Sequence, residues 1–316
     1  MTAYRHLELR RADPEELVGV IDGSEMRHRV LPGGELTVRL DQARLGRGWL
    51  QRGRYGMGVL AQGALPAGVI TIGGMLRSPA DTVINGFLCP PGSLQVHAEH
   101  CELHYRAAPH TTWIAYCIDR ATLQEAALRL FGELLPLPAC GSQHVRPRPA
   151  MTRRLAATIE ALFAAERWPA RADPARASED RLLFDVVSAL LAGRPGASTD
   201  RDLLRAEQRR RLMERAEEYL RAHLAQPFAL GAFADAVGVS HRMLEYHFRR
   251  SYGVSPLAWH RSMRLDAVRR DLRLARRRGE SVTTVALRWG FTHFGRFAEE
   301  YRRLYGERPI DTLRAS

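Results

Sequence analysis

The amino-terminal third of the chain alternates between hydrophobic and polar positions with a period of two, which is typical of β-strands with one buried face. The strand-like runs are residues 36–40, 69–72, 82–84 and 113–118. The turn-forming stretches that we expect to separate such strands are Pro32-Gly33-Gly34, Gly73-Gly74 and Pro90-Pro91-Gly92. Many short strands without intervening helices predict an antiparallel sandwich or a small barrel.

From Ala121 onward the apolar residues recur at helical spacing. The predicted helices cover residues 121–135, 151–163 and 181–191, and the stretch Gly193–Ser198 is the best candidate for a linker because it is rich in Gly, Pro and Ser. Everything after it has helical periodicity. The fold class is therefore α+β. We expect a β-rich domain over residues 1–145, a helical connector and linker over residues 146–208, and an all-helical domain over residues 209–316.

The last domain contains an internal repeat. Ala234, Gly238 and Ser240 recur at an offset of 52 as Ala286, Gly290 and Thr292. Phe248, Gly253 and Pro256 recur at an offset of 53 as Tyr301, Gly306 and Pro309, so the second copy has one extra residue. Each copy has the pattern helix, tight turn, helix. A longer helix from about Pro256, which includes residues 266–274, joins the two copies.

The residue types of the repeat suit a helix-turn-helix. The alanine lets two helices approach closely, and the glycine four residues later permits the positive φ of a tight turn. Ser240 and Thr292 can cap the second helix of each pair. The residues that we expect on the inward faces are Leu244, His247 and Phe248 in the first copy, and Phe297 and Tyr301 in the second. A joining helix of roughly 27 Å is close to the roughly 34 Å between successive major-groove openings on one DNA face.

Positive charge is concentrated in the same domain. The chain has a net charge of +12, and all its basic residues are arginine. Residues 209–316 contain 22 arginines and 12 acidic residues, a net charge of +10, so the rest of the chain is nearly neutral. This distribution indicates a polyanion-binding module attached to a domain with another role.

The segment from about Leu212 to Arg314 resembles the DNA-binding domain of the AraC/XylS family of bacterial regulators. The resemblance covers about a third of the chain. It rests on residues 230–234, 239–244, Phe248, 253–256, 264–265 and Ala267, and in the second copy on residues 285–291, 296–297, 301–302 and 306–309.

In that family the exposed face of the second helix of each pair contacts bases. Transferred by position, this implies base contacts for Arg242, Glu245, Tyr246, His293, Phe294 and Arg296. The phosphate contacts that we expect are Ser240, Arg249, Arg250, Thr292, Arg302 and Arg303. Gly295 lies early in the second of these helices and weakens it by roughly 1 kcal/mol relative to alanine. The first copy is therefore the better candidate for base reading.

The resemblance also implies the role of the whole chain, an effector-responsive activator of transcription. Its partners would be double-stranded DNA, RNA polymerase, a small-molecule effector of unknown identity and a second copy of the chain, with no cofactor and no enzymatic activity. The amino-terminal part would be a cupin-like or jelly-roll β-barrel with packed helices that senses the effector and dimerises. Its layout is similar to regulators of the ethanolamine-utilisation type. Without a signal peptide or a membrane span in the sequence, we expect the protein in the cytoplasm.

Histidines in the β-rich domain leave an alternative open, a metal-dependent cupin-type enzyme or a metal sensor fused to a DNA-binding module. If they lie on a strand, His100, Glu102 and His104 share one face, with His97 nearby and His28 or His110 as distant partners. We favour polar residues on the solvated face of a sheet, and thus no metal. The four cysteines form no CxxC pair, which argues against a zinc site, a repair methyltransferase or an amidotransferase module. A purely architectural DNA-binding protein would leave the strand-rich domain without a role.

Overall fold

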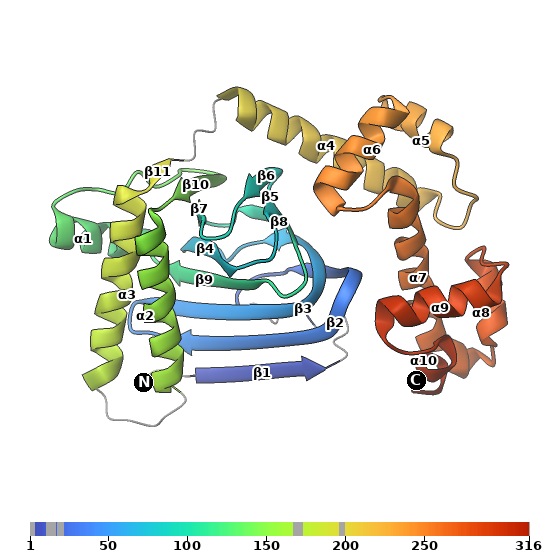
Figure 1. Cartoon of the computed structure of the whole chain (residues 1–316), viewed down its shortest axis with the longest axis horizontal. Coiled ribbons are helices and arrows are strands. Elements are labelled where there is room, and N and C mark those ends of the chain that lie inside the picture. Colours follow the sequence, from blue (N-terminus) through green and yellow to red (C-terminus); the bar gives the residue numbers. More distant parts are fainter. Residues whose placement is uncertain (1–3, 11–16, 18–21, 167–172, 196–199, 316) are drawn as a thin grey trace. The chain divides into compact units, whose positions relative to one another are not determined.

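The computed structural model describes residues 4–10, 17, 22–166, 173–195 and 200–315 (Figure 1). Contacts between residues divide the chain into two compact units. The first consists of Met1–Arg29 and Leu36–Leu203, and the second of Val30–Glu35 and Leu204–Ser316. Of the expected linker Gly193–Ser198, residues 196–198 lie outside the described part of the chain.

The first unit is built on one antiparallel sheet. Its strands are β1 (Tyr4–Arg10), β2 (Arg27–Arg44), β3 (Gly48–Ala64), β4 (Ile70–Arg77), β5 (Thr82–Ile84), β6 (Phe87–Cys89), β7 (Leu94–His97), β8 (Glu102–Ala107), β9 (Thr112–Ile118), β10 (Ser142–Arg146) and β11 (Arg194–Pro195). Their order is β11-β10-β7-β4-β9-β3-β8-β5-β6, and β2 pairs with both β1 and β3. Because β3 pairs with β9 through Gly48–Arg54 and with β8 through Val59–Ala64, the sheet curls into a nearly closed barrel. The predicted barrel is confirmed.

Three helices cover one face of this sheet (Figure 1): α1 (Arg120–Phe131), α2 (Pro149–Glu166) and α3 (Asp173–Ala192). The strand residues on this face, such as Ile72, Val96 and Tyr116, form one core with Leu155 and Val186 of the helices. Directly opposed residues of neighbouring strands share a face, so alternate strand positions face the other way, into the barrel.

Two of the expected turns are not turns. β2 is continuous through Pro32-Gly33-Gly34, and β4 is continuous through Gly73-Gly74, so both predictions are wrong. Proline has a φ compatible with an extended strand, and glycine tolerates close approach of neighbouring groups. A Cβ added to Gly74 would lie 2.8 Å from Leu94 Cδ2, so a side chain here would displace Leu94. The turn at Pro90-Pro91-Gly92 is confirmed between β6 and β7.

The second unit is helical, as predicted. It contains α4 (Asp200–Ala222), α5 (Leu230–Val237), α6 (His241–Tyr252), α7 (Pro256–Ala275), a 3₁₀ turn η2 (Arg276–Arg278), α8 (Val282–Arg288), α9 (Phe294–Tyr305) and α10 (Pro309–Ala315). The predicted joining helix is confirmed as α7, whose 20 residues make it about 30 Å long. Within the described residues, no helix has the length and apolar character needed to cross a bilayer.

Candidate nucleic-acid interface

The two copies of the repeat form two helix pairs, α5 with α6 and α8 with α9, and each pair turns on a glycine. Gly238 and Gly290 have φ of +74° and +71°, as the sequence predicts. A Cβ added to Gly290 would also lie 2.1 Å from Nη2 of Arg264 on α7, so the Arg264 side chain would have to shift. The guanidinium of Arg264 also donates to the carbonyl of Trp289 and lies over the Phe291 ring, so it binds the second turn to α7.

The second helices of the pairs differ at their amino-terminal ends. The Ser240 hydroxyl caps α6 by accepting a hydrogen bond from the amide of Met243 at 3.3 Å, as predicted. Thr292 does not cap α9, so that prediction is wrong: α9 begins at Phe294, and its N-cap residue His293 makes no side-chain cap bond. The extra residue of the second copy lies in this turn, which moves Thr292 one position too far from the helix.

Aligned by their first residues, α6 and α9 both contain 12 residues at an offset of 53. Their inward faces are fully buried, with Leu244 and Phe248 in α6 and Phe297 and Tyr301 in α9, as predicted. His247, which was expected on the same inward face, is only half-buried. One face of each helix therefore fixes it to its own helix pair, and the opposite face is open.

The open face of α6 carries the candidate base-contacting residues of the first copy. Arg242 is exposed and forms no ion pair with any residue that the structure describes. Tyr246 is 49% exposed and accepts a hydrogen bond from Nη1 of Arg250 at 3.3 Å. Glu245 is half-buried and lies 3.6 Å from Nη2 of Arg249. Arg242 is thus the cation on this face that is available to pair with a base edge.

The open face of α9 differs in chemistry. His293 and Phe294 are exposed, and Phe294 retains 41% of its accessible surface. Nε of Arg296 donates to Oε1 of Glu300 at 3.0 Å, so this cation already has an acidic partner. Gly295 takes the place that Arg242 has in α6, and an added Cβ there would have no heavy atom within 4 Å.

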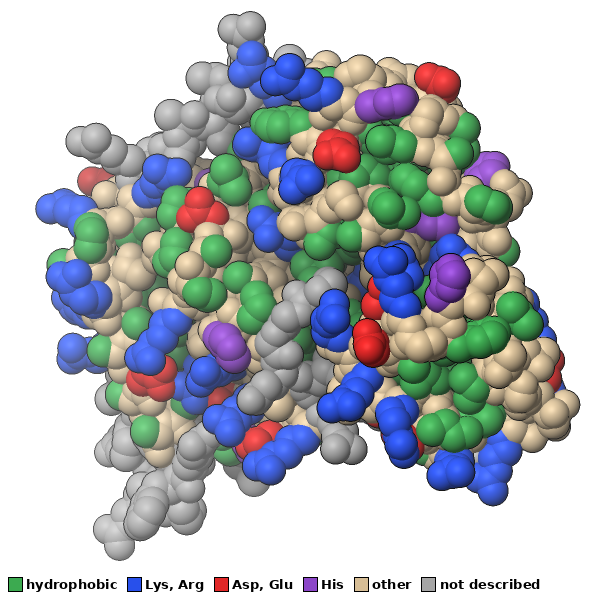
Figure 2. Space-filling model, turned by 45° about the vertical axis from the view of Figure 1, so that its right-hand side comes forward, with side chains coloured by type: hydrophobic (Ala, Val, Ile, Leu, Met, Phe, Trp, Pro, Cys, Tyr) green, Lys and Arg blue, Asp and Glu red, His purple; other side chains and the backbone are tan. Residues whose placement is uncertain are grey.

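The expected phosphate contacts lie at both ends of the two helices. Arg249 and Arg250 occupy the last turn of α6, and Arg302 and Arg303 the last turn of α9. All are exposed except the half-buried Arg250, while Ser240 and Thr292 are exposed at the opposite ends. Figure 2 shows arginine side chains interspersed with exposed apolar ones on the surface that comes forward.

Next to the last turn of α6, positive groups crowd together. Burial lowers the pKa of His247, and the charges of Arg209 on α4 and Arg250 lower it further. The guanidinium groups of Arg209 and Arg250 therefore give this end of α6 a positive potential that suits a phosphate. Sequence patterns did not single out Arg209.

The sequence also failed to predict two buried hydrogen bonds that anchor α6 and α9. The hydroxyl of Tyr252, at the end of α6, donates to Oε1 of Glu217 on α4 at 2.6 Å. The hydroxyl of Tyr305, at the end of α9, donates to Oδ1 of Asp266 on α7 at 2.6 Å. Each copy thus has a long helix that holds the following helix pair by the same kind of bond.

Sequence patterns also did not single out Met243 as a candidate base contact, although this residue is 44% exposed on the first turn of α6.

The histidines of the first unit do not form the expected arrangement. His100 lies in a turn before β8 with φ of +53°, so its expected place on a strand is wrong. His97 is only 2% exposed and not on a solvated face, and its Nδ1 lies 2.7 Å from the Ser142 hydroxyl. Among the described residues, no group of three His, Cys, Asp or Glu side chains is placed to hold a metal ion. Cys89, Cys101 and Cys117 are buried free thiols, and Cys140 is exposed.

Comparison with known proteins agrees with this geometry for the second unit. Residues 233–315 match the family model described as a helix-turn-helix domain. A probable thc operon regulatory protein of Rhodococcus erythropolis is 42% identical over 99 residues, which are 31% of this chain and 30% of that protein. A XylDLEGF operon transcriptional activator of Pseudomonas putida is 36% identical over 101 residues, or 32% of each chain. The matches thus span about a third of these relatives.

Solved structures give matches of two kinds. A probable AraC family transcriptional regulator from Rhodopseudomonas palustris is 32% identical and covers 33% of this chain and 96% of its own, with a TM-score of 0.32. The AraC-like transcriptional activator CuxR is 16% identical and covers 83% of this chain and 94% of its own, with a TM-score of 0.42. From the family model and the sequence relatives, the carboxy-terminal domain of this chain is a helix-turn-helix domain of the AraC/XylS type.

Proposed function

We propose that the chain is a transcription activator that binds specific sequences of double-stranded DNA, with α6 and α9 as recognition helices in adjacent major grooves. The observation that carries the proposal is the repeated geometry. Two helices of 12 residues are presented by the same kind of turn and are joined through the 20-residue α7. The net charge of +10 in residues 209–316 supplies the electrostatic attraction to DNA.

The exposed face of each recognition helix would read the bases. Arginine suits guanine, a glutamate accepts from cytosine, and an aromatic ring contacts the thymine methyl group. The proposed base contacts are Arg242, Glu245, Tyr246, His293, Phe294 and Arg296. The proposed phosphate contacts are Ser240, Arg249, Arg250, Thr292, Arg302 and Arg303, which would fix the register of the domain on the duplex without reading sequence.

The first unit would act as the sensor of the regulator. Its barrel would bind a small-molecule effector and its helices would contribute to a homodimer, while the DNA-bound protein would recruit RNA polymerase. In this proposal the protein works in the cytoplasm and catalyses no reaction. The domain organisation follows the same division, with a sensor over residues 1–145, a connector over residues 146–208 and the DNA-binding domain over residues 209–316.

Selection of binding sites from a library of random DNA duplexes tests this proposal. The full chain should enrich one sequence. At fixed salt it should bind that sequence on the order of 10³-fold more tightly than a scrambled duplex of the same length and composition. The dissociation constant should rise steeply with salt concentration. An equal affinity for the enriched and the scrambled duplex would contradict the proposal and favour an architectural protein.

A further inference from the structure

A pocket of about 510 Å³, including the open space at its mouth, lies inside the barrel of the first unit. The strand pairing of the sheet places five residues in one row, of which Ala115, Gly73 and Gln95 line the pocket. The row runs from Gln51 on β3 through Ala115 on β9, Gly73 on β4 and Gln95 on β7 to His144 on β10. Directly opposed residues share a face, and Ala115 and Gly73 are too small to fill the space in front of them.

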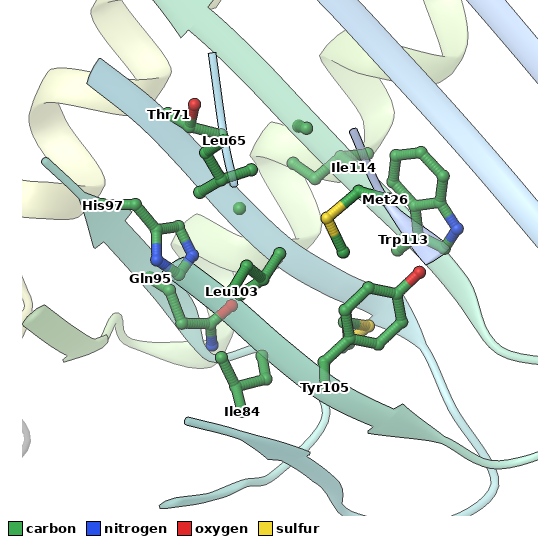
Figure 3. Close-up of a pocket in the computed structure, with 14 residues that line it drawn as sticks. Met26, Leu65, Thr71, Ile84, Gln95, His97, Leu103, Tyr105, Trp113 and Ile114 are labelled. Carbon is green, nitrogen blue, oxygen red and sulfur yellow. The ribbon is translucent and has the colours of Figure 1, made fainter. Parts of the chain in front are cut away.

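The small residues of this row leave room beside buried polar side chains. Thr71 and His97, also directly opposed, form the neighbouring row. Figure 3 shows His97 and Gln95 at one end of the pocket, with Met26, Tyr105 and Trp113 at the other. The pocket therefore has a polar end and an apolar end.

Gln95 is the strongest indication of a ligand. Its side chain is fully buried and lines the pocket. Among the described residues, neither its Oε1 nor its Nε2 has a hydrogen-bond partner with normal geometry, and its polar contact with the Cys89 thiol is a weak one. A buried amide without partners is unfavourable, because it has lost its hydrogen bonds to water. An amide presents an acceptor beside a donor, so one group that offers a donor beside an acceptor satisfies both atoms.

The charge of the pocket narrows the class of ligand. None of the residues described as lining it is Asp, Glu or Arg, and burial lowers the pKa of His97 to about 3, so this histidine is neutral. An ion that entered would lose its hydration without gaining an opposite charge. At the apolar end, Nε1 of Trp113 is buried and forms no hydrogen bond of normal geometry with the described residues, and the Tyr55 hydroxyl is a weak polar neighbour.

We propose that this pocket binds an uncharged small molecule with a carboxamide or lactam group on a compact apolar body, the amide paired with the side chain of Gln95 and the body placed against Trp113 and Met26. The inference rests on the proposed function in taking the barrel as the sensor, and it names the chemical class of the effector.

Calorimetric titration of the full chain tests the proposal with four probes of similar shape. Benzamide and cyclohexanecarboxamide carry the neutral amide, and benzoate and benzylammonium are charged counterparts. At least one carboxamide should bind, and at least tenfold more tightly than either charged probe, the factor that corresponds to about 1.4 kcal/mol.

Two substitutions locate the site. Gln95→Leu keeps the side-chain volume similar and removes the amide, and it should weaken carboxamide binding about tenfold, the loss expected for hydrogen bonds of ordinary strength. Gly73→Ala should abolish binding, because the new Cβ would lie 3.4 Å from Nε2 of His97 and 3.7 Å from Oε1 of Gln95. These are ordinary contact distances, so the methyl group occupies the polar end without disturbing the fold. Gly295→Ala adds a methyl group in the other unit and should leave carboxamide binding unchanged.

The same preparations are titrated with the enriched DNA duplex. In the absence of carboxamide, both barrel variants should retain the DNA affinity of the parent chain, which shows that the second unit is folded. Their circular dichroism spectra and thermal unfolding should match those of the parent chain, which shows that the barrel is folded. If neither carboxamide binds, if the charged probes bind as tightly, or if Gln95→Leu retains full affinity, the inference is overturned. Retained selective DNA binding then separates this failure from a failure of the proposed function.

Discussion

The two helix-turn-helix copies have the same buried positions and differ in the side chains that they expose. At the buried positions, Leu244 of α6 corresponds to Phe297 of α9, and Phe248 corresponds to Tyr301. On the open face the chemistry changes, because Arg242 corresponds to Gly295. Packing against neighbouring helices restricts the buried positions to large apolar or aromatic side chains, whereas the open positions are restricted only by what they contact. If the domain binds DNA as proposed, the two copies would hold it alike and read it differently.

The hydrogen bonds around the buried faces also differ between the copies. Aromatic rings pack in both: Phe248 meets Phe233 and Tyr252 edge to face, and Phe297 meets Tyr301 edge to face. In the second copy the hydroxyl of Tyr301 lies 2.7 Å from that of Thr312, which donates to Glu307. The second copy is thus also held by a buried polar chain.

The largest effect that we expect follows from removing the aromatic core of the first copy. Phe248→Ala should lower the free energy of unfolding of the second unit by about 3 to 5 kcal/mol, since the ring is completely buried. Tyr301→Phe should cost only about 1 kcal/mol, because Thr312 keeps its bond to Glu307. Chemical denaturation of the full chain, followed by circular dichroism, measures both. Equal losses would contradict the packing role given to the Phe248 ring and the hydrogen-bonding role given to the Tyr301 hydroxyl.

Removing one cation from each open face tests the difference in DNA contacts. Arg242→Ala should weaken binding of the enriched duplex by about 1 to 3 kcal/mol, the range of a bidentate arginine–guanine contact. Arg296→Ala should weaken it less, because Arg296 already bonds to Glu300. Fluorescence anisotropy at fixed salt gives the dissociation constants. Arg129→Ala, an exposed arginine on α1, is the control for loss of one charge. An equal loss for Arg242→Ala and Arg129→Ala would exclude a base contact by Arg242.

The N-cap of α6 forms a side-chain hydrogen bond and the N-cap of α9 does not. From this difference we expect an effect on stability that is smaller than the loss for Phe248→Ala. Ser240→Ala should lower the free energy of unfolding by about 1 kcal/mol, because the amide of Met243 loses its acceptor. His293→Ala at the equivalent position should have almost no effect, since His293 makes no cap bond. Thermal or chemical unfolding of the two variants side by side checks this. A larger loss for His293→Ala would show that the second helix begins differently.

The smallest expected effect is a gain in stability. Gly295→Ala should raise the free energy of unfolding by about 0.5 to 1 kcal/mol, because alanine favours the helix and the added Cβ meets no heavy atom within 4 Å. The same denaturation experiment measures the gain. A destabilised variant would mean that α9 needs the freedom of a glycine at this position.

Sequence patterns predicted the second unit well because its features are local. Gly238 and Gly290 are required by a turn of fixed shape, and the buried faces follow helical spacing. The pattern failed where one extra residue between Gly290 and α9 displaced Thr292 from the cap position. An offset that changes within a repeat indicates an insertion, and only the structure shows on which side of the threonine it lies.

Contacts between segments that lie far apart in the chain could not be predicted from the sequence. Tyr252 and Glu217 are 35 residues apart, and no local period connects them. In the first unit, Gln95 and His97 alternate with Leu94 and Val96 along β7, so periodicity places the two polar residues on one face but could not show that this face is buried inside the barrel. That assignment needed the pairing of β7 with β4, which places Gly73 opposite Gln95.

The most direct test of the central claim is to repeat the selection from random duplexes with the Arg242→Ala and Arg296→Ala chains. If the first copy reads the bases and the second mainly positions the protein, Arg242→Ala should remove the preference for specific bases over part of the enriched sequence. Arg296→Ala should enrich the same sequence as the parent chain, with lower affinity. An unchanged enriched sequence for Arg242→Ala, together with a changed one for Arg296→Ala, would contradict the account.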